Sequence, residues 1–177
     1  MHSGIDGIDG VISRLGRHHP PHLAGRLLAK SASPWAAAVQ GLAAAAALRA
    51  EGRPWLLVAL SAPSATVGAK ALKKLTGRRR PGFARFERKG DESFPSSHVA
   101  GHAAVLAALS QVAPRSTAWR AVLALACGSS LAIAVERVCA GRHWPSDVLA
   151  GAALGIGVGV AFGRLARRTG PVRDEVR

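Results

Sequence analysis

The interpretation of the fold starts from residues 143–163, which read HWPSDVLAGAALGIGVGVAFG. From Val148 to Gly163 this stretch contains no Lys, Arg, Asp or Glu. A helix rises about 1.5 Å per residue and the hydrocarbon core of a bilayer is about 30 Å thick, so a helix over 144–163 just spans it. Because the stretch is rich in Ala and Gly rather than in Leu and Phe, we expect it to pack closely against other helices.

Four more apolar stretches precede it, at about 33–49, 54–72, 97–113 and 119–136. A tryptophan stands at or near the start of four of the five stretches, and this residue favours the headgroup level of a membrane. The pattern predicts an all-α fold, a polytopic membrane helix bundle of about five transmembrane helices. A soluble bundle with buried helices is the alternative. The four tryptophans are Trp35, Trp55, Trp119 and Trp144.

Composition and charge are hard to reconcile unless the chain lies in a membrane. Of its 177 residues 49% are hydrophobic, yet the formal net charge is +14. The charged residues crowd into the segments between the apolar stretches, which is typical of polytopic membrane proteins. The length allows one domain. We assign residues 32–165 to a membrane-embedded domain and residues 166–177 to a polar, basic tail.

The first 31 residues have a different pattern, in which apolar and basic residues interleave around Pro20 and Pro21. This pattern predicts an N-terminal amphipathic segment that lies on the membrane surface. A disordered basic tail is the alternative. The segment contains no apolar core long enough for export, so no signal peptide is predicted.

Four glycines recur at every fourth position of the last stretch: Gly151, Gly155, Gly159 and Gly163. On a helix they fall on one stripe, where another backbone can approach closely. Two interpretations stay open at this point. The stripe either packs inside the bundle or forms the face of a homodimer.

Three polar clusters stand at the edges of the apolar stretches. The first is Lys73, followed after six residues by Arg80 and Pro81, and the second is the run PSSH at 95–98. The third is Arg137, followed after five residues by His143 and after three more by Asp147. Cations and imidazoles at the depth of the membrane surface suit a phosphate group carried on a lipid.

The spacing of His143 and Asp147 places both on one face of a helix start. Asp147 can accept the N–H of one ring nitrogen, which leaves the other nitrogen of His143 free to attack an electrophile. A polar pair that merely satisfies itself at the interface is the alternative.

His98 lies at the start of the stretch after Pro95, where free backbone N–H groups attract anions. Beside such a site it can give a proton to a leaving oxygen. We interpret His102, one turn further on, as a packing or supporting residue.

The cations complete the predicted site, because arginine forks match phosphate oxygens in pairs and lysine adds a point charge. The candidates are Lys73, Arg80 and Arg137. The basic run KKLTGRRRP is unspecific alone, since it also suits anionic headgroups or nucleic acid. No metal site, disulfide or cofactor is expected: Cys127 and Cys139 would lie ~18 Å apart on one helix, and no HExxH or CxxC is present.

The three clusters in order resemble the signature of the type 2 phosphatidic acid phosphatase superfamily, KxxxxxxRP, PSGH and SRxxxxxHxxxD. The resemblance covers about residues 33–163 and implies a helical membrane bundle and a metal-free phosphatase. It implies His143 as the nucleophile that forms a phosphohistidine, Asp147 as its orienting partner and His98 as the acid. The implied phosphate-binding groups are Lys73, Arg80, Ser96, Arg137 and the backbone N–H of Ser97.

Two positions depart from that signature. Ser97 replaces the glycine of PSGH, which keeps the backbone N–H but adds a side chain that narrows the pocket or restricts the turn. Glu136 replaces the serine before Arg137. A carboxylate there either pairs with Arg137 or repels phosphate, so Glu136 is not counted among the phosphate ligands.

Within this superfamily the chain is similar to small bacterial members that act on the phosphomonoester or pyrophosphate of polyprenyl lipids or glycerolipids. Most Lys and Arg fall on the side of the clusters, which predicts a site that faces the cytoplasm in a multi-pass protein of the inner (plasma) membrane. Its composition resembles that of high-GC actinobacterial proteins, where this placement suits a decaprenylphosphoryl-5-phosphoribose phosphatase. The alternatives are an undecaprenyl pyrophosphate, phosphatidic acid or phosphatidylglycerophosphate phosphatase. The non-enzyme alternative is a basic membrane scaffold, and no nucleic-acid partner is expected.

Overall fold

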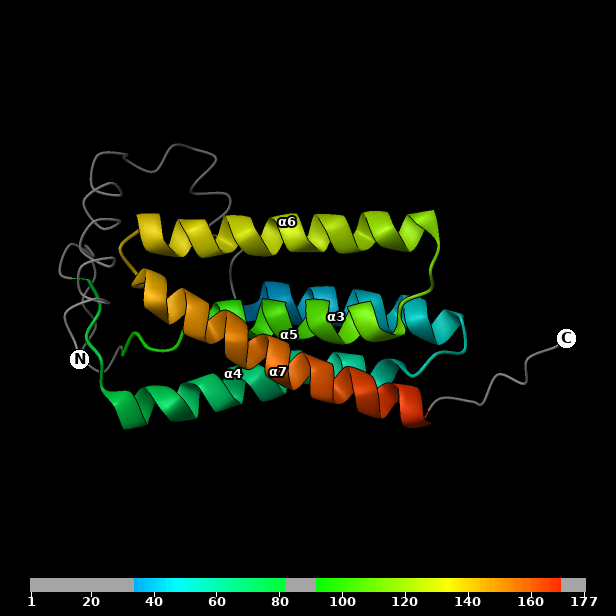
Figure 1. Cartoon of the computed structure of the whole chain (residues 1–177), viewed down its shortest axis with the longest axis horizontal. Helices are drawn as coiled ribbons and strands as arrows, with labels where there is room; N and C mark the ends of the chain where they lie inside the picture. The colour runs from blue at the N-terminus through cyan, green and yellow to red at the C-terminus, as the bar shows by residue number, and fades with distance from the viewer. Residues whose placement is uncertain (1–33, 82–91, 170–177) are drawn as a thin grey trace, which may run out of the picture.

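A computed structural model describes residues 34–81 and 92–169, and both parts are entirely helical or irregular. Five helices follow one another along the chain and lie roughly side by side (Figure 1). The numbering of the helices follows the figure. The helices are α3 (Pro34–Ala50), α4 (Trp55–Thr76), α5 (Ser97–Val112), α6 (Thr117–Cys139) and α7 (Pro145–Thr169).

Helix α5 is the centre of the bundle, since it contacts each of the other four described helices and packs most extensively against α7. Helix α6 contacts mainly α5 and stands apart from α3 and α4 (Figure 1). The chain reverses direction at every connection, so that α4 and α6 end where α5 and α7 begin, at the left of Figure 1. All three polar clusters of the sequence lie at this end, which we call the site end.

The predicted all-α membrane bundle is confirmed, with helix boundaries that differ from the predicted ones by a few residues. Helices α4, α6 and α7 are long and apolar enough to cross a membrane, whereas α5 has only 16 residues and rises about 24 Å. Helix α4 runs on to Thr76 and ends at Gly77, whose φ of 58° is left-handed. Lys73 is therefore a helical residue of the last turn, although the predicted stretch ended at residue 72.

The glycine stripe of α7 is buried against α5 of the same chain. A Cβ atom on Gly151 would lie 2.5 Å from the carbonyl oxygen of Ser96, and one on Gly155 would lie 2.8 Å from the Cβ of Ala103. Of the two interpretations of the stripe, packing within the bundle is the one observed. A homodimer through these glycines would have to displace α5.

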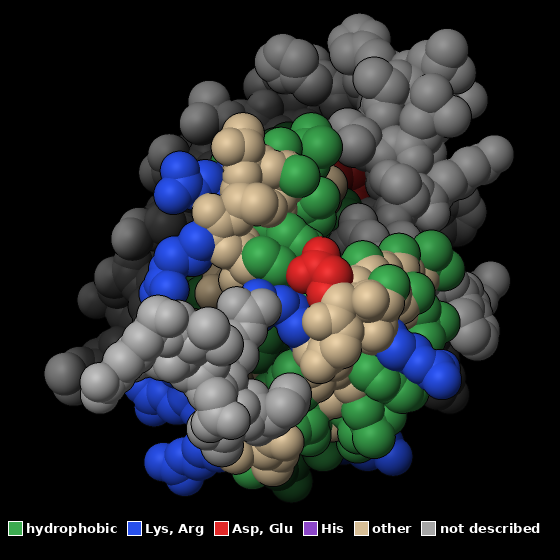
Figure 2. Space-filling view, turned by 90° about the vertical axis from the view of Figure 1, so that its right-hand side faces the viewer, with side chains coloured by type: hydrophobic (Ala, Val, Ile, Leu, Met, Phe, Trp, Pro, Cys, Tyr) green, Lys and Arg blue, Asp and Glu red, His purple; other side chains and the backbone are tan. Residues whose placement is uncertain are grey.

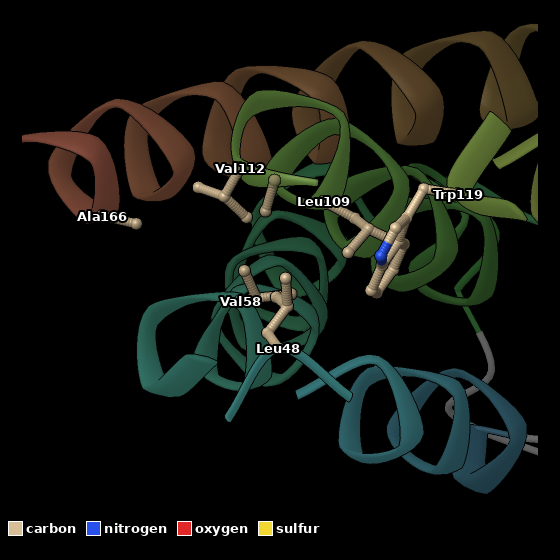
Figure 3. Close-up of a cluster of buried hydrophobic side chains, with 7 residues drawn as sticks. Leu48, Val58, Leu109, Val112, Trp119 and Ala166 are labelled. Carbon is tan, nitrogen blue, oxygen red and sulfur yellow. The ribbon is translucent and has the colours of Figure 1, made fainter. Parts of the chain in front are cut away.

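Small residues form the part of the core nearest the site, with Ala65 and Ala69 of α4 packed on Ala100 and Ala104 of α5. Toward the opposite end larger side chains fill the core. There a cluster joins all five helices (Figure 3). It contains Leu48, Val58, Ala108, Leu109, Val112, Trp119 and Ala166.

Large apolar side chains cover the outside of the bundle instead of its inside. Leu125 and Leu131 of α6 are 76% and 66% exposed, and Leu149 of α7 is 71% exposed. In water such a surface would be costly, whereas in lipid it is the expected one. This arrangement excludes the soluble bundle. Figure 2 looks onto the end opposite the site, where Lys and Arg side chains lie around apolar ones, as at a membrane boundary.

Two predicted segments fall wholly or largely outside the described residues. The N-terminal amphipathic segment 1–31 lies outside them, and so does the tail after Thr169. The first four residues predicted for that tail, 166–169, continue α7, because an Arg-rich end keeps its charges at the surface while the helix goes on.

We predict that Gly155→Ala destabilises the protein, because the added methyl group meets the backbone of α5. Overpacking of this kind costs about 1–3 kcal/mol, which thermal unfolding in detergent would register as a lower midpoint. Gly157→Ala is the matched control, since Gly157 is on the same helix with nothing within 4 Å of an added Cβ. Helix propensity alone would make that change neutral or stabilising by up to about 1 kcal/mol. Equal midpoints for the two variants would show that the helices do not touch here.

Candidate active site

The site end of the bundle gathers the residues of all three motifs. Lys73 comes from the last turn of α4 and Arg80 from the segment that follows it. Ser96, Ser97 and His98 form the N-cap and first turn of α5. Arg137 lies in the last turn of α6, His143 in the connection to α7 and Asp147 in the first turn of α7. Residues up to 74 positions apart in the sequence thus meet at one end of the fold.

The buried ring of His143 is oriented by a backbone carbonyl. Its Nδ1 lies 2.9 Å from the carbonyl oxygen of Ser93 and 3.5 Å from Oδ2 of Asp147. A carbonyl oxygen only accepts hydrogen bonds, so Nδ1 carries the proton. In this tautomer Nε2 keeps its lone pair and is the nitrogen able to act as a nucleophile.

Asp147 is fully buried and serves more partners than the predicted one. Its Oδ2 accepts the backbone N–H of Trp144 at 2.8 Å and its Oδ1 accepts Nη1 of Arg78 at 2.9 Å. The first contact is half of a capping box at the start of α7. The carbonyl oxygen of Ser93 lies closer to Nδ1 of His143 than Oδ2 of Asp147 does, so the carbonyl shares the orienting role that was predicted for Asp147.

Two polar atoms are buried at the start of α5 without a hydrogen-bond partner among the described residues, Oγ of Ser96 and Nδ1 of His98. Ser96 is the N-cap residue, yet its side chain makes no capping bond. A buried polar atom without a partner is unusual in a folded protein and suggests a missing ligand. Beside them the first-turn N–H groups of α5 have no acceptor within the helix and can bind an anion.

The cations of the first motif hold backbone carbonyl groups. Nζ of Lys73 donates to the carbonyl oxygens of Glu92 and Ser93 at 2.6 and 3.2 Å, and Nη1 of Arg80 donates to that of Arg142 at 2.6 Å. The charges of Lys73 and Arg80 both act on His143. These two cations are therefore placed around the imidazole by neutral acceptors, which are weaker partners than a phosphate dianion.

Arg137 is buried and pairs with its neighbour Glu136, with Nε and Oε2 3.3 Å apart. Of the two roles considered for Glu136, pairing with Arg137 is the one observed, and its carboxylate offsets the charge of Arg137. The charge of Arg137 also acts on His98 and on the buried His102, which follows His98 by one turn of α5. His102 thus lies in the wall of the site, where packing was predicted.

Burial lowers the pKa of His143 below its ordinary value. Its hydrogen bonding with Asp147 opposes this effect, while the nearby Lys73 and Arg80 add to it. A lowered pKa means that the ring stays neutral as the pH falls through the range in which a free histidine takes up a proton. His143 is therefore held in the form that has a nucleophilic lone pair.

Three residues of the site were missed by the sequence interpretation: Ser93, Arg78 and Trp144. The Oγ of Ser93 donates to the carbonyl oxygens of Arg78 and Arg79, both at 3.1 Å, and Nε1 of Trp144 donates to that of Arg79 at 3.0 Å. Backbone carbonyls leave no trace in a residue pattern. Arg78 was hidden in a run of three arginines that only the fold distinguishes.

The donor set suits an anion rather than a metal ion. Over residues 34–81 and 92–169, no three His, Cys, Asp or Glu side chains gather in the way a metal site requires. What gathers is a ring of cations, a neutral imidazole with a free lone pair and a second histidine. Such a set can bind a phosphoryl group, attack it and protonate a leaving oxygen.

We predict that Ser93→Ala weakens both fold and site. The variant loses the Oγ–H that holds the carbonyls of residues 78 and 79, which costs about 0.5–1.5 kcal/mol of unfolding free energy. It also frees the carbonyl that orients His143, so any phosphatase rate should fall. Ser64→Ala, at an exposed position of α4, is the control and should change neither thermal midpoint nor rate. A Ser93 variant that matches this control would contradict the role of the carbonyl.

Comparison with solved structures shows the same fold in two proteins. The crystal structure of a transmembrane PAP2 type phosphatidylglycerolphosphate phosphatase from Bacillus subtilis aligns with a TM-score of 0.79 at 22% identity, over 97% of this chain and 91% of that chain. The structure of Aquifex aeolicus LpxE aligns with a TM-score of 0.52 at 24% identity, over 93% of this chain and 88% of that chain. No curated protein sequence matches the chain.

Comparison with protein families identifies one match, to the PAP2 superfamily over residues 54–170. The matched region begins with α4 and ends just after α7, and so includes every residue of the candidate site. The chain therefore belongs to the PAP2 superfamily, as its three motifs predicted.

Proposed function

We propose that this membrane protein of the PAP2 superfamily is a lipid phosphate phosphatase that works through a phosphohistidine on His143. The observation that carries the proposal is the contact between Nδ1 of His143 and the carbonyl oxygen of Ser93, 2.9 Å long. This contact places the proton on Nδ1 and leaves the lone pair on Nε2, in a ring on which the charges of Lys73 and Arg80 act.

In the first step, Nε2 of His143 attacks the phosphorus atom and the bond from phosphorus to the lipid oxygen breaks. His98 gives a proton to the departing oxygen, and the negative charge of the bound phosphate favours the protonated form of His98 beforehand. The imidazole gains positive charge as it bonds to phosphorus. Asp147 and the carbonyl of Ser93 stabilise that charge from the Nδ1 side.

In the second step, water attacks the phosphohistidine, His98 takes a proton from it and the bond from phosphorus to Nε2 breaks. Inorganic phosphate leaves and His143 returns to its neutral tautomer. Throughout, spread negative charge on the phosphoryl oxygens needs fixed donors. We assign these to Lys73, Arg80, Arg137, Oγ of Ser96 and the backbone N–H of Ser97.

The position of the site favours a lipid substrate. The site residues lie within about a turn of the helix ends, so a phosphate headgroup can reach them while its lipid tail stays beside the apolar outer surface. We propose a phosphomonoester of a polyprenyl lipid or a glycerolipid. Decaprenylphosphoryl-5-phosphoribose and phosphatidylglycerophosphate both have this chemistry, and the second is the substrate named for the similar Bacillus subtilis protein.

We predict that phosphate release from lipid phosphates persists in EDTA and is inhibited by vanadate, a phosphate mimic. The reason is that side-chain cations take the place of a divalent metal. Wild-type protein denatured at alkaline pH should contain a phosphoenzyme that is labile to acid, which His143→Gln abolishes. His98→Gln should slow its formation from a lipid phosphate by about 10²–10⁴-fold, and by much less from an aryl phosphate whose leaving group needs no proton.

Several outcomes would contradict this mechanism. A phosphoenzyme that persists in His143→Gln would move the nucleophile to another residue, and activity lost in EDTA but restored by Mg²⁺ would require a metal. Ser64→Ala serves as the control for expression and detergent extraction. A panel that contains a polyprenyl phosphate, phosphatidic acid, phosphatidylglycerophosphate and a polyprenyl pyrophosphate separates the candidate substrates.

We further propose that the site faces the cytoplasm of a cell bounded by the inner (plasma) membrane. Both ends of the bundle are basic, so the assignment rests on the excess of Lys and Arg on the site side of the whole chain. Helix α6 separates the two ends, with the exposed Arg115 before it and the exposed Arg142 after it.

Labelling of single cysteines would test the sidedness. In a background with Cys127 and Cys139 replaced, we expect Arg115→Cys to react with a membrane-impermeant maleimide in intact cells. Arg142→Cys should react only after the membrane is permeabilised, because it lies at the site end. The reverse pattern would place the site outside the cytoplasm and leave the proposed chemistry intact.

A further inference from the structure

We infer that Arg78, at one of the unspecified positions of the first motif KxxxxxxRP, is a positioning residue that holds Asp147 and thereby sets the charge state and orientation of His143. The inference rests on the proposed function for its kinetic consequences. Its geometry stands on contacts among four side chains at the site end: Arg78, Trp144, Ser146 and Asp147.

The side chain of Arg78 makes three contacts at the start of α7, with Trp144, Ser146 and Asp147. Its Nη1 donates to Oγ of Ser146 at 2.7 Å and to Oδ1 of Asp147 at 2.9 Å. The guanidinium also stacks on the ring of Trp144, with its central carbon 5.4 Å from the ring centroid. The Asp147 side chain is fully buried and that of Arg78 is 29% exposed, so their ion pair is largely shielded from water.

Hydrogen bonds also fix the backbone around Arg78. Gly77 ends α4 in a left-handed conformation and turns the chain toward α7. The carbonyl of Arg78 accepts both the backbone N–H of Ser93 at 2.8 Å and its Oγ–H at 3.1 Å. The next carbonyl, of Arg79, accepts Nε1 of Trp144 at 3.0 Å. The guanidinium therefore reaches Asp147 from a backbone that three hydrogen bonds hold in place.

The contact with Arg78 gives the two carboxylate oxygens of Asp147 different partners. Oδ1 of Asp147 pairs with Arg78, while Oδ2 lies 3.5 Å from Nδ1 of His143. A carboxylate whose charge is shared with Arg78 attracts a proton on His143 less strongly than an unpaired one would. Arg78 thus keeps the imidazole neutral until it bonds to phosphorus. It acts on the nucleophile through Asp147, in contrast to the cations assigned to the phosphate.

The other charged groups around His143 bear on the same equilibrium. Lys73 of α4 and Arg80 of the following segment disfavour its protonation, while Asp147 of α7 favours it. His98 of α5 interacts electrostatically with His143, and Arg137 of α6 acts on His98. Removal of Arg78 leaves these groups in place, so its effect on His143 can be measured separately.

The kinetic test compares Arg78→Gln with Arg79→Gln, which makes the same chemical change at the neighbouring, exposed position. For Arg78→Gln we expect kcat to fall about 10–100-fold, as when a group that orients a metal-ligating histidine is removed. We expect KM to change by less than about threefold, because Arg78 is not assigned to the phosphate. Arg79→Gln should behave as the wild type. A large rise in KM at Arg78 with kcat unchanged would instead make it a phosphate ligand and overturn the inference.

A second readout reports on His143 without turnover. In detergent-solubilised full-length protein with ¹³C-labelled histidine rings, the His143 signal can be assigned as the one absent from His143→Gln. Without Arg78 the undivided charge of Asp147 favours the imidazolium, so the pKa of His143 should rise by on the order of one pH unit. The acid limb of the pH profile of kcat/KM should move to higher pH together with this pKa. Arg79→Gln should leave both unchanged, and a His143 titration unaltered by Arg78→Gln would refute the inference.

Arg78→Lys keeps the charge but loses the flat surface that stacks on Trp144. We expect it to retain the wild-type titration of His143 within a few tenths of a pH unit and to lose kcat several-fold less than Arg78→Gln. If Arg78→Gln does not fold, judged by thermal unfolding, Arg78→Lys is compared with Arg79→Lys. Equal kcat for those two would refute the positioning role. Absence of any lipid phosphatase activity in the wild type would refute the proposed function, whereas the titration of His143 would still decide the role of Arg78.

Discussion

The direct contact between the backbones of α5 and α7 is the constraint on which this structure depends. Three residues of α7 have no Cβ atom: Gly151, Gly155 and Gly159. Backbone carbonyl groups of α5 and its N-cap therefore lie where side chains of α7 would otherwise be. At the site end the contact becomes a hydrogen bond from the backbone N–H of Ser96 to the carbonyl oxygen of Asp147, 2.9 Å long. The first turns of α5 and α7 are thereby joined main chain to main chain. Packing of larger side chains would separate them.

Backbone carbonyls organise the site as much as side chains do. The carbonyl oxygen of Ser93 accepts from both His143 and Lys73, and that of Arg142 accepts from Arg80. An acceptor that cannot donate leaves the imidazole only one tautomer, which an ionisable partner such as a carboxylate would not do at every pH. Lys73 and Arg80 donate to these neutral carbonyl oxygens. A phosphate can replace the carbonyls as acceptor at little cost in free energy, because hydrogen bonds from a cation to phosphate are stronger.

The two carboxylates of the site are matched to two of its arginines, Asp147 to Arg78 and Glu136 to Arg137. Each pair removes repulsion in a crowded cationic region without supplying a metal-binding cluster. Glu136 stands where the superfamily signature has serine, and it offsets the charge of an arginine that we assign to the phosphate. The site of this chain therefore differs from the signature in net charge.

Much of the fold and the members of the site follow from the printed residues. Apolar length and tryptophan positions predicted the helices to within a few residues, since crossing a bilayer demands a minimum length and charges must stay outside it. The motif spacings predicted which side chains belong together, because helix starts and ends at one membrane surface bring them there. Contacts made by backbone atoms could not be predicted in this way: the glycine stripe suited a partner helix in the same chain or in another. The acceptor for His143 and the choice of Arg78 among three adjacent arginines also required the assembled bundle, since each depends on distances between segments that are far apart in the sequence.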